Sequence, residues 1–257
     1  MWDPQQYRRF GGERSRPFFD LLARVGAEQP RRVVDLGCGP GELTATLAAR
    51  WPGATVLGVD SSPAMIETAR AGQPADGRLS FQLGDASTWQ PDAPVDVLVA
   101  NAVLQWLPGQ SEALARWAGL LSAGGWLAVQ APGNFDQPGH VIMRELAASA
   151  RWRPLLDGVV LNRQAGDPAG YLELLAGAGC ETDAWETTYL HVLPGDNPVL
   201  DWYKGTGLRP VIDALPPDQA AGFIAEYGDR VREAYPARPY GTVLPFRRVF
   251  VVARRRE

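Results

Sequence analysis

The sequence predicts an α/β fold in which a mostly parallel sheet carries helices on both faces. Through the first half of the chain, short apolar runs rich in β-branched residues alternate with helical patterns, whose apolar residues recur at spacings of three and four. A glycine-rich stretch, LGCGPGE, directly follows the first apolar run. Strand and helix units in this order favour parallel pairing, because each helix returns the chain to the same edge of the sheet.

The strand segments of the first half are bounded by Gly, Pro, Asp or Asn residues. We expect strands at 32–36, 54–59, 79–83, 95–100 and 126–131, and helices at 42–50, 63–71 and 111–121. The third of these helices places Leu114 and Trp117 on one apolar stripe, and Gly124 and Gly125 are expected to end it.

The second half of the chain has a different pattern, in which helical stretches are mixed with helix breakers. We expect helices within 136–168 and over 168–178, and strands over 181–193 and 246–255. The residues between these two strands are too many for a tight hairpin. They are therefore expected to form a helical insertion that acts as a lid over the sheet.

Composition restricts the class of protein. The chain has 257 residues, of which 46% are hydrophobic and 21% charged, as in an ordinary globular domain. A net charge of −4 argues against a nucleic-acid partner. No segment is apolar enough for a membrane span or a signal peptide. Two cysteines, Cys38 and Cys180, fit a reducing compartment and are too few for a multi-cysteine metal site. We therefore expect a cytoplasmic protein without a metal.

The glycine loop indicates an anionic or polar ligand. Gly37 and Gly39 allow positive φ and a close approach of the backbone, and Gly41 opens a helix whose N–H groups favour negative charge. However, the spacing G-C-G-P-G differs from the G-x-G-x-x-G of dinucleotide folds. Asp35 directly precedes the loop and would repel a pyrophosphate, whereas it would attract the ammonium group of an amino acid.

Two further acids follow the next strands. Asp60 ends the second strand, where a carboxylate can accept hydrogen bonds from both hydroxyls of a ribose. Asp85 follows the third strand, where the edge of an adenine would lie. A ligand with an amino-acid end, a ribose and an adenine but no phosphate is S-adenosylmethionine, which we predict as the cofactor.

Residues from about 30 to 131 resemble the class I S-adenosylmethionine-dependent methyltransferases. The stretches that carry the resemblance are VVDLGCGPGELT, VLGVDSSPAMIETA, GDASTW and DVLVANAVLQWL. The resemblance implies a Rossmann-like sheet of seven strands whose last strand, 246–255, is antiparallel. It implies that the cofactor is bound at the methionine part by Asp35, Gly37, Cys38, Gly39 and Gly41, at the ribose by Asp60 and Ser61, at the adenine by Asp85 and Ala86, and beside the methyl group by Asn101.

The same resemblance implies an arrangement of regions along the chain. Residues 1–30 would form an N-terminal helical segment that covers the cofactor, with Tyr7 among the residues that close over it. Residues 31–132 would form the cofactor-binding core. Residues 133–257 would complete the sheet and supply the lid, at about 136–168 and 197–238.

The flanking stretches, among them WETTYLH and TGLRP, resemble the trans-aconitate 2-methyltransferases over nearly the entire chain. This resemblance implies a carboxyl O-methyltransferase that forms the monomethyl ester of trans-aconitate or a related small polycarboxylate. The chemistry agrees with such a reaction, because a carboxylate is already ionised at neutral pH and needs no general base. It needs placement in line with the methyl carbon and a site that excludes water.

Cationic side chains should bind the carboxylates that do not react, while the reacting carboxylate meets neutral donors. The candidate substrate residues are Arg14, Arg16, Gln105, Trp106, Tyr189, His191, Arg209 and Arg248. Arg247 and Arg248 cannot both face a pocket, since successive strand residues point to opposite faces, and Arg248 is preferred because it better matches the family's pattern. A surface position or a structural ion pair is the alternative for each arginine, and a structural role is the alternative for His191.

Two other functions remain open from the sequence. One is methyl transfer to another small-molecule carboxylate or hydroxyl group, such as a fatty-acyl compound or a secondary metabolite, which would need an apolar lid and no arginine clamp. The other is a cofactor-binding protein without catalysis.

Overall fold

A computed structural model describes residues 11–161 and 166–257. The chain divides into two compact units. The sheet unit consists of Ser15–Pro132, Ala165–Glu186 and Arg248–Glu257, and the helical unit consists of Met1–Arg14, Gly133–Gln164 and Thr187–Arg247. Within the described residues, no helix is both long and apolar enough to cross a bilayer.

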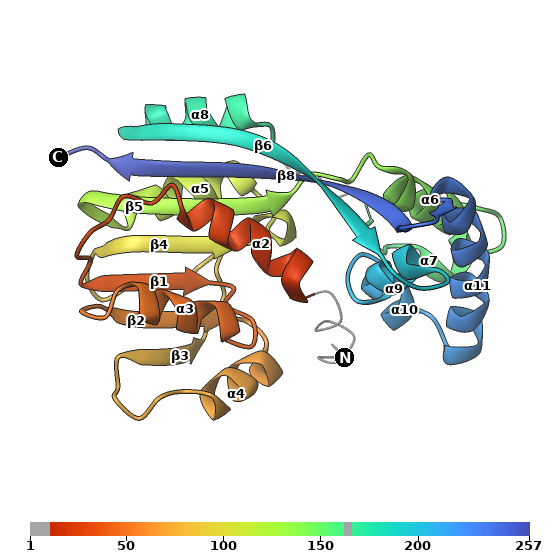
Figure 1. The fold of residues 1–257 in the computed structure, drawn as a ribbon, viewed down its shortest axis with the longest axis horizontal. Coiled ribbons are helices and arrows are strands. Elements are labelled where there is room, and N and C mark those ends of the chain that lie inside the picture. Colours follow the sequence, from red (N-terminus) through yellow and green to blue (C-terminus); the bar gives the residue numbers. More distant parts are fainter. Residues whose placement is uncertain (1–10, 162–165) are drawn as a thin grey trace. The chain divides into compact units, whose positions relative to one another are not determined.

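The strands form one mixed sheet (Figure 1). They are β1 (Arg32–Leu36), β2 (Thr55–Asp60), β3 (Leu79–Leu83), β4 (Val95–Asn101), β5 (Leu121–Pro132), β6 (Cys180–Leu193), β7 (Ala237–Arg238) and β8 (Gly241–Arg255). The order is β3-β2-β1-β4-β5-β8-β6, and the short β7 pairs only with β8. The pairs β1–β2, β1–β4, β2–β3 and β4–β5 are parallel, whereas β8 is antiparallel to β5. The predicted seven-stranded sheet with a reversed last strand is therefore confirmed.

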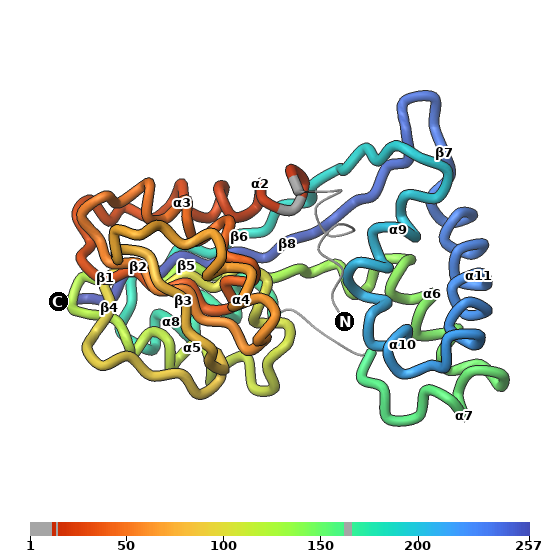
Figure 2. Tube along the Cα trace, turned by 90° about the horizontal axis from the view of Figure 1, so that it is seen from below, coloured from red at the N-terminus to blue at the C-terminus, as the bar shows by residue number. Residues whose placement is uncertain are grey.

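Helices cover both faces of this sheet. They are α2 (Gly11–Leu22), α3 (Glu42–Arg50), α4 (Pro63–Ala71), α5 (Gln110–Gly119) and α8 (Pro168–Gly177), with the 3-10 turn η1 (Leu104–Trp106) after β4. Figure 2 shows α2 and α3 on one face and α5 and α8 on the other. On the α5 face, Leu98 and Val129 of the sheet belong to one buried cluster with Trp117 of α5 and Leu175 of α8. Burial of this face is what fixes the register of the strands.

The helical unit has its own core. Its helices are α6 (Pro138–Ala147), α7 (Arg153–Leu156), α9 (Pro198–Lys204), α10 (Arg209–Ala214) and α11 (Pro217–Ala234). Aromatic side chains that include Trp152, Trp202 and Phe223 fill the space between them. Tyr227 Oη donates to the carbonyl of Gly139 at 3.0 Å, which joins α11 to α6. The function of these helices as a lid remains a prediction.

The sequence-based prediction was wrong at the junction of α5 and β5. The helix ends at Gly119, and β5 already begins at Leu121, so that Gly124 and Gly125 lie within the strand. Gly124 has a φ of 73°, and a Cβ on Gly125 would lie 2.9 Å from the carbonyl oxygen of Ser122. The pairing of β4 with β5 is irregular at this point. The two glycines therefore permit a distortion of the strand.

Candidate functional site

The glycine loop joins β1 to α3 at the carboxyl edge of the sheet. Gly37, Gly39 and Gly41 have φ values of 74°, 55° and 84°, which are in the left-handed region. A Cβ on Gly37 would lie 2.1 Å from Cγ2 of Val103, and one on Gly41 would lie 2.6 Å from Cζ of Phe81. At Gly39, by contrast, no atom lies within 4 Å of the corresponding position. Two of the glycines are therefore required by packing, while Gly39 leaves room for a ligand.

Asp60 connects the end of β2 to the loop. Its Oδ2 accepts a hydrogen bond from the backbone N–H of Gly39 and its Oδ1 accepts one from that of Ser62, both at 2.9 Å. A carboxylate oxygen has two lone pairs, so each still has an acceptor position for a ribose hydroxyl. Ser61, between these partners, is exposed.

The Cys38 side chain is buried in the loop, where its thiol donates to the carbonyl oxygen of Gly39 at 3.6 Å. Burial raises the pKa of this thiol, and the negative charges of Asp35 and Asp60 raise it further. The thiol is therefore protonated at neutral pH and is not a nucleophile.

Asp35 is a buried carboxylate that lies before the loop, with 3% of its surface exposed. Its Oδ2 accepts a hydrogen bond of 2.6 Å from the hydroxyl of Thr44 on α3. Burial raises the pKa of Asp35 to about 6, with the Thr44 hydrogen bond opposing this shift and the charge of Asp60 adding to it. A cation bound beside this carboxylate would favour its ionised form. The geometry thus suits the ammonium group that the sequence predicts there.

The predicted adenine residues follow β3. The exposed carboxylate of Asp85 accepts a hydrogen bond of 2.7 Å from the N–H of Ser87, and hydrogen bonding to Ser87 lowers its pKa. The carbonyl of the buried Ala86 accepts hydrogen bonds from Trp117 Nε1, at 3.1 Å, and from Arg116 on α5. Ala86 thus anchors the segment to α5, and its contact with an adenine remains a prediction.

Backbone strain marks the end of β4. Ala102 has a φ of 57°, and no other non-glycine residue in the described ranges has a positive φ. Its N–H donates to the carbonyl of Gln130 at 2.8 Å, and its carbonyl accepts from Gln105 Nε2 at 2.7 Å. Two buried oxygens beside it, Asn101 Oδ1 and Gln105 Oε1, have no hydrogen-bond partner among the described residues. Such strain and unsatisfied acceptors are typical of functional sites.

Arg248 lies on β8 with 5% of its surface exposed, and its Nη1 donates to Gln130 Oε1 on β5 at 3.2 Å. Arg247 is only half-buried and donates to the carbonyl of Gly133 at 3.1 Å. The two arginines thus have different surroundings, as expected from the alternation of side chains along a strand. Sequence reasoning missed Gln130. Its signal is a single polar residue in the apolar run WLAVQAP, beside Asn101 in the neighbouring strand.

Two further candidate substrate residues, Trp106 and Arg16, are exposed. Trp106, on η1, has 46% of its surface exposed. The Arg16 side chain, on α2, is 70% exposed, and its Nε lies 3.8 Å from Asp20 Oδ2, which fits a surface ion pair. Tyr7 and the side chain of Arg14 lie outside the described residues.

In the helical unit, three candidate residues have structural partners. Tyr189 and His191 are buried on β6 with parallel rings whose centroids are 6.0 Å apart, and His191 also stacks on Trp202 at 5.2 Å. Arg209, at the start of α10, forms an ion pair of 2.9 Å with Asp213 on the same helix. Each contact fits the structural alternative, and substrate binding by these residues remains a prediction.

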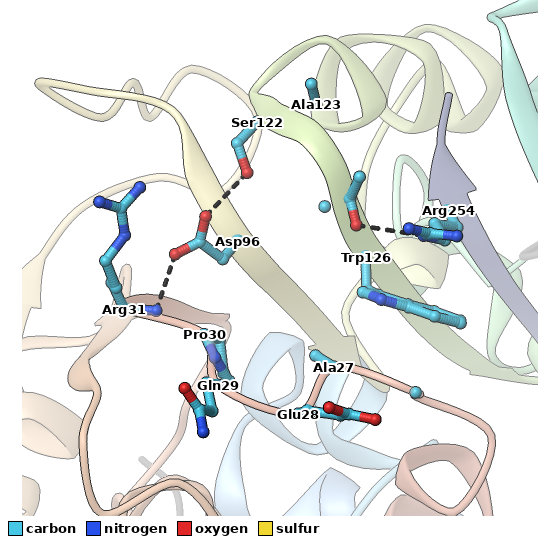
Figure 3. Close-up of a pocket in the computed structure, with 13 residues that line it drawn as sticks. Ala27, Glu28, Gln29, Pro30, Arg31, Asp96, Ser122, Ala123, Trp126 and Arg254 are labelled. Carbon is cyan, nitrogen blue, oxygen red and sulfur yellow. Dashed lines mark hydrogen bonds between the residues drawn. The ribbon is translucent and has the colours of Figure 1, made fainter. Parts of the chain in front are cut away.

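A cavity of about 550 Å³ lies at the amino edge of the parallel strands (Figure 3). Its lining includes Asp96, which accepts hydrogen bonds from the N–H groups of Arg31, at 2.7 Å, and Arg32, at 3.1 Å, and from Ser122 Oγ, at 2.8 Å. None of the predicted site residues lines it. Its polar groups hold the strand starts together, which indicates a structural role.

Comparison with known proteins gives the family. A family profile described as "Methyltransferase domain" matches residues 33–125. Trans-aconitate 2-methyltransferase from Streptomyces coelicolor is 54% identical over 264 residues, with 100% of this chain and 87% of that protein covered. The protein of the same name from Mycobacterium sp. (strain KMS) is 52% identical over 257 residues, with 99% of both chains covered.

Solved structures of lower identity support the fold. YcgJ protein from Bacillus subtilis superposes with a TM-score of 0.60 at 14% identity, with 94% of this chain and 99% of that chain covered. Phosphoethanolamine N-methyltransferase 2 from Haemonchus contortus gives a TM-score of 0.57 at 15% identity, with 94% of this chain and 53% of that chain covered. The full-length identities confirm the prediction of S-adenosylmethionine as cofactor. They show that the chain belongs to the trans-aconitate 2-methyltransferase family.

Proposed function

We propose that this protein transfers the methyl group of S-adenosylmethionine to a carboxylate of trans-aconitate, or of a closely related small polycarboxylate, to give a monomethyl ester. The observation that carries the proposal is the identity of more than half of the residues with proteins of that activity over the full chain. Two buried features of the carboxyl edge support it, namely the carboxylate of Asp35 and the guanidinium of Arg248.

The residues around the glycine loop fit the cofactor. The open position at Gly39 gives it space. The buried acceptor Asn101 Oδ1 has no partner in the part of the chain that the structure describes, and it can take a hydrogen bond from one of the cofactor's N–H or O–H groups. We propose that Asp35 binds the ammonium group and that Asp60 binds the ribose hydroxyls. When bound, the cofactor supplies an electrophilic methyl group on a sulfonium.

The acceptor needs no base from the protein, since its carboxylate is ionised at neutral pH. The task of the site is to place one carboxylate oxygen in line with the methyl carbon and to exclude water, which would solvate that oxygen. Arg248, held by Gln130, is proposed to bind a carboxylate that does not react. Arg209 is proposed as a second cationic group for the substrate.

The test is incubation of the purified protein with methyl-labelled cofactor and single acceptors, with base-labile methyl esters as the readout. The acceptors are trans-aconitate, cis-aconitate, citrate, isocitrate and free fatty acids. We expect the largest kcat/KM with trans-aconitate. Transfer only to fatty acids, or to none of these acceptors, would contradict the proposal.

Two variants control this assay. Asp35→Asn should lower ester formation at a limiting cofactor concentration, which shows that the activity belongs to this chain. Asp96→Asn changes the same residue type at the other edge of the same sheet and should leave the rate unchanged. Equal rates for wild type and Asp35→Asn would contradict the proposed role of Asp35 in cofactor binding.

A further inference from the structure

Gln130 is a polar side chain with none of its surface exposed, near the carboxyl end of the largely apolar strand β5. Its Oε1 accepts a hydrogen bond of 3.2 Å from Arg248 Nη1. Its Nε2 is buried and has no hydrogen-bond partner within residues 11–161 and 166–257. A guanidinium only donates hydrogen bonds, so the contact with Arg248 fixes which end of the amide is the oxygen. The end that remains without a partner is therefore a neutral N–H donor.

The register of the strands places this donor beside the predicted methyl-transfer position. Asn101 and Gln130 are direct neighbours in β4 and β5. Asp35, Val99 and Ala128 form the preceding row on the same face of the sheet, because side chains two residues apart point the same way. The opposite face carries the apolar cluster packed on α5 and α8. Gln130 thus shares its face with the acid proposed to bind the cofactor ammonium.

The atoms without partners at this edge differ in kind. Asn101 Oδ1 and Gln105 Oε1 are acceptors, which an ionised carboxylate cannot satisfy but which the N–H and O–H groups of a cofactor can. Gln130 Nε2 is a donor, which suits a carboxylate. A buried donor without a partner is unfavourable, and a bound carboxylate would remove that penalty.

We propose that Gln130 Nε2 donates a hydrogen bond to the substrate carboxylate that receives the methyl group, while Arg248 binds a carboxylate that does not react. This inference rests on the proposed function. In the reaction a carboxylate oxygen forms a bond to the methyl carbon, the carbon–sulfur bond breaks, and its electron pair stays on sulfur. Both charges disappear, and no proton moves. A neutral amide can orient the attacking oxygen without the ion pair that would stabilise its charge before the reaction.

Two variants separate the donor from the acceptor of this amide. Gln130→Met removes both at similar length, whereas Gln130→Glu keeps an acceptor for Arg248 but has no N–H group. With trans-aconitate we expect kcat to fall about 10- to 100-fold in both variants, as for loss of one hydrogen bond to a charged group. The Kd of the cofactor, measured by calorimetry, should stay within about twofold of the wild type. The control Gln29→Glu, an exposed residue of the same sheet unit, should leave kcat unchanged.

A wild-type kcat in Gln130→Glu would overturn the inference, because Gln130 would then act only by holding Arg248. An unchanged kcat in Gln130→Met would overturn it as well. Thermal unfolding shows whether each variant is folded. If one of them is not folded, Gln130→Asn, which moves the donor back by one methylene, is measured in its place. It should show the same fall in kcat. If the wild-type protein neither methylates nor binds any polycarboxylate, both the proposed function and the inference are overturned. If the wild type is active and the Gln130 variants are equally active, only the inference is overturned.

Discussion

The two edges of the central sheet hold an acid in opposite ways, the partly buried Asp96 at the amino edge and the buried Asp35 at the carboxyl edge. At the amino edge, burial tends to raise the pKa of Asp96, but hydrogen bonds from Arg31, Ser122 and Arg32 outweigh this, and the pKa is lowered. At the carboxyl edge, burial dominates at Asp35 and raises its pKa to about 6, although Thr44 donates to it.

The same contrast holds for neutral polar atoms. The carboxyl edge contains the strained Ala102 and the buried atoms Asn101 Oδ1, Gln105 Oε1 and Gln130 Nε2 without partners. The amino edge has a cavity, but its acid is satisfied within the protein (Figure 3). A cavity alone is therefore not evidence of a binding site. Incomplete hydrogen bonding is the better indicator of a site, since a fold retains such a cost where a ligand removes it.

The largest expected effect separates two arginines on one face of β8. Arg248→Met should raise the KM for trans-aconitate about 100-fold, because a buried charged hydrogen bond to the substrate is lost. Arg254 lies six positions further along the strand and lines the amino-edge cavity. The variant Arg254→Met should therefore leave KM unchanged. Steady-state kinetics test both variants. A comparable loss of cofactor affinity in Arg248→Met would mean that Arg248 is structural.

Replacement of Asp35 should weaken cofactor binding and increase the stability of the cofactor-free protein. Asp35→Asn is expected to weaken cofactor binding about 30-fold through loss of the ammonium partner. Because the folded-state pKa lies above the usual 3.8, the contribution of Asp35 to stability is fully present below pH 3.8 and is lost as the pH rises through about 6. Without cofactor at pH 8, the variant should therefore be more stable by about 3 kcal/mol. Denaturant unfolding at pH 8 and pH 4 checks this, and equal stability of both proteins at pH 8 would argue against it.

Replacement of Asp96 should lower the stability and leave catalysis unchanged. Asp96→Asn keeps one oxygen for the N–H groups of Arg31 and Arg32, but it removes the negative charge and puts an N–H group where the Ser122 hydroxyl donates. We expect the free energy of unfolding to fall by about 2 kcal/mol, because hydrogen bonds to a charged acceptor are stronger. The steady-state constants should not change. A raised KM with unchanged stability would assign a function to the amino edge and remove the contrast between the edges.

A smaller effect is expected outside the sheet unit. Arg209→Met should raise the KM for trans-aconitate about tenfold, because a substrate carboxylate is proposed to replace Asp213 as the partner of this guanidinium. Loss of an ion pair within one helix should change stability by only about 0.5 kcal/mol. The matched variant Asp213→Asn removes the acid and keeps the arginine, so its KM should not rise. Equal effects of both substitutions would indicate a structural pair.

The strand pattern and the glycine loop followed from the sequence, because they depend on local periodicity. Alternation along a strand predicted different surroundings for Arg247 and Arg248, whereas the preference for Arg248 came from the resemblance and stays a prediction. The end of α5 did not, since Gly124 and Gly125 can either end a helix or distort a strand, and pairing with β4 decides between these. Long-range contacts of this kind are not encoded in a short window.

The site was predictable to a similar extent. The acids at the strand ends follow from topology, since ligands of open α/β sheets bind at the carboxyl edge. The role of Gln130 depends on its pairing with Asn101 and on its contact with Arg248, from a strand more than a hundred residues away. The aromatic surroundings of His191 likewise depend on Trp202 and Phe246, which no local pattern relates to it.

The central claim is that the carboxyl edge binds the cofactor through the buried carboxylate of Asp35, whose pKa is raised. Calorimetric titration of S-adenosylmethionine between pH 5 and pH 7 tests it most directly, because an α-amino group stays protonated over this range. For the wild type and for Asp96→Asn, the Kd should fall about tenfold as the pH rises through about 6 and Asp35 ionises. For Asp35→Asn, the Kd should be higher and independent of pH. A wild-type Kd that does not change with pH, or the same change in Asp35→Asn, would contradict the claim.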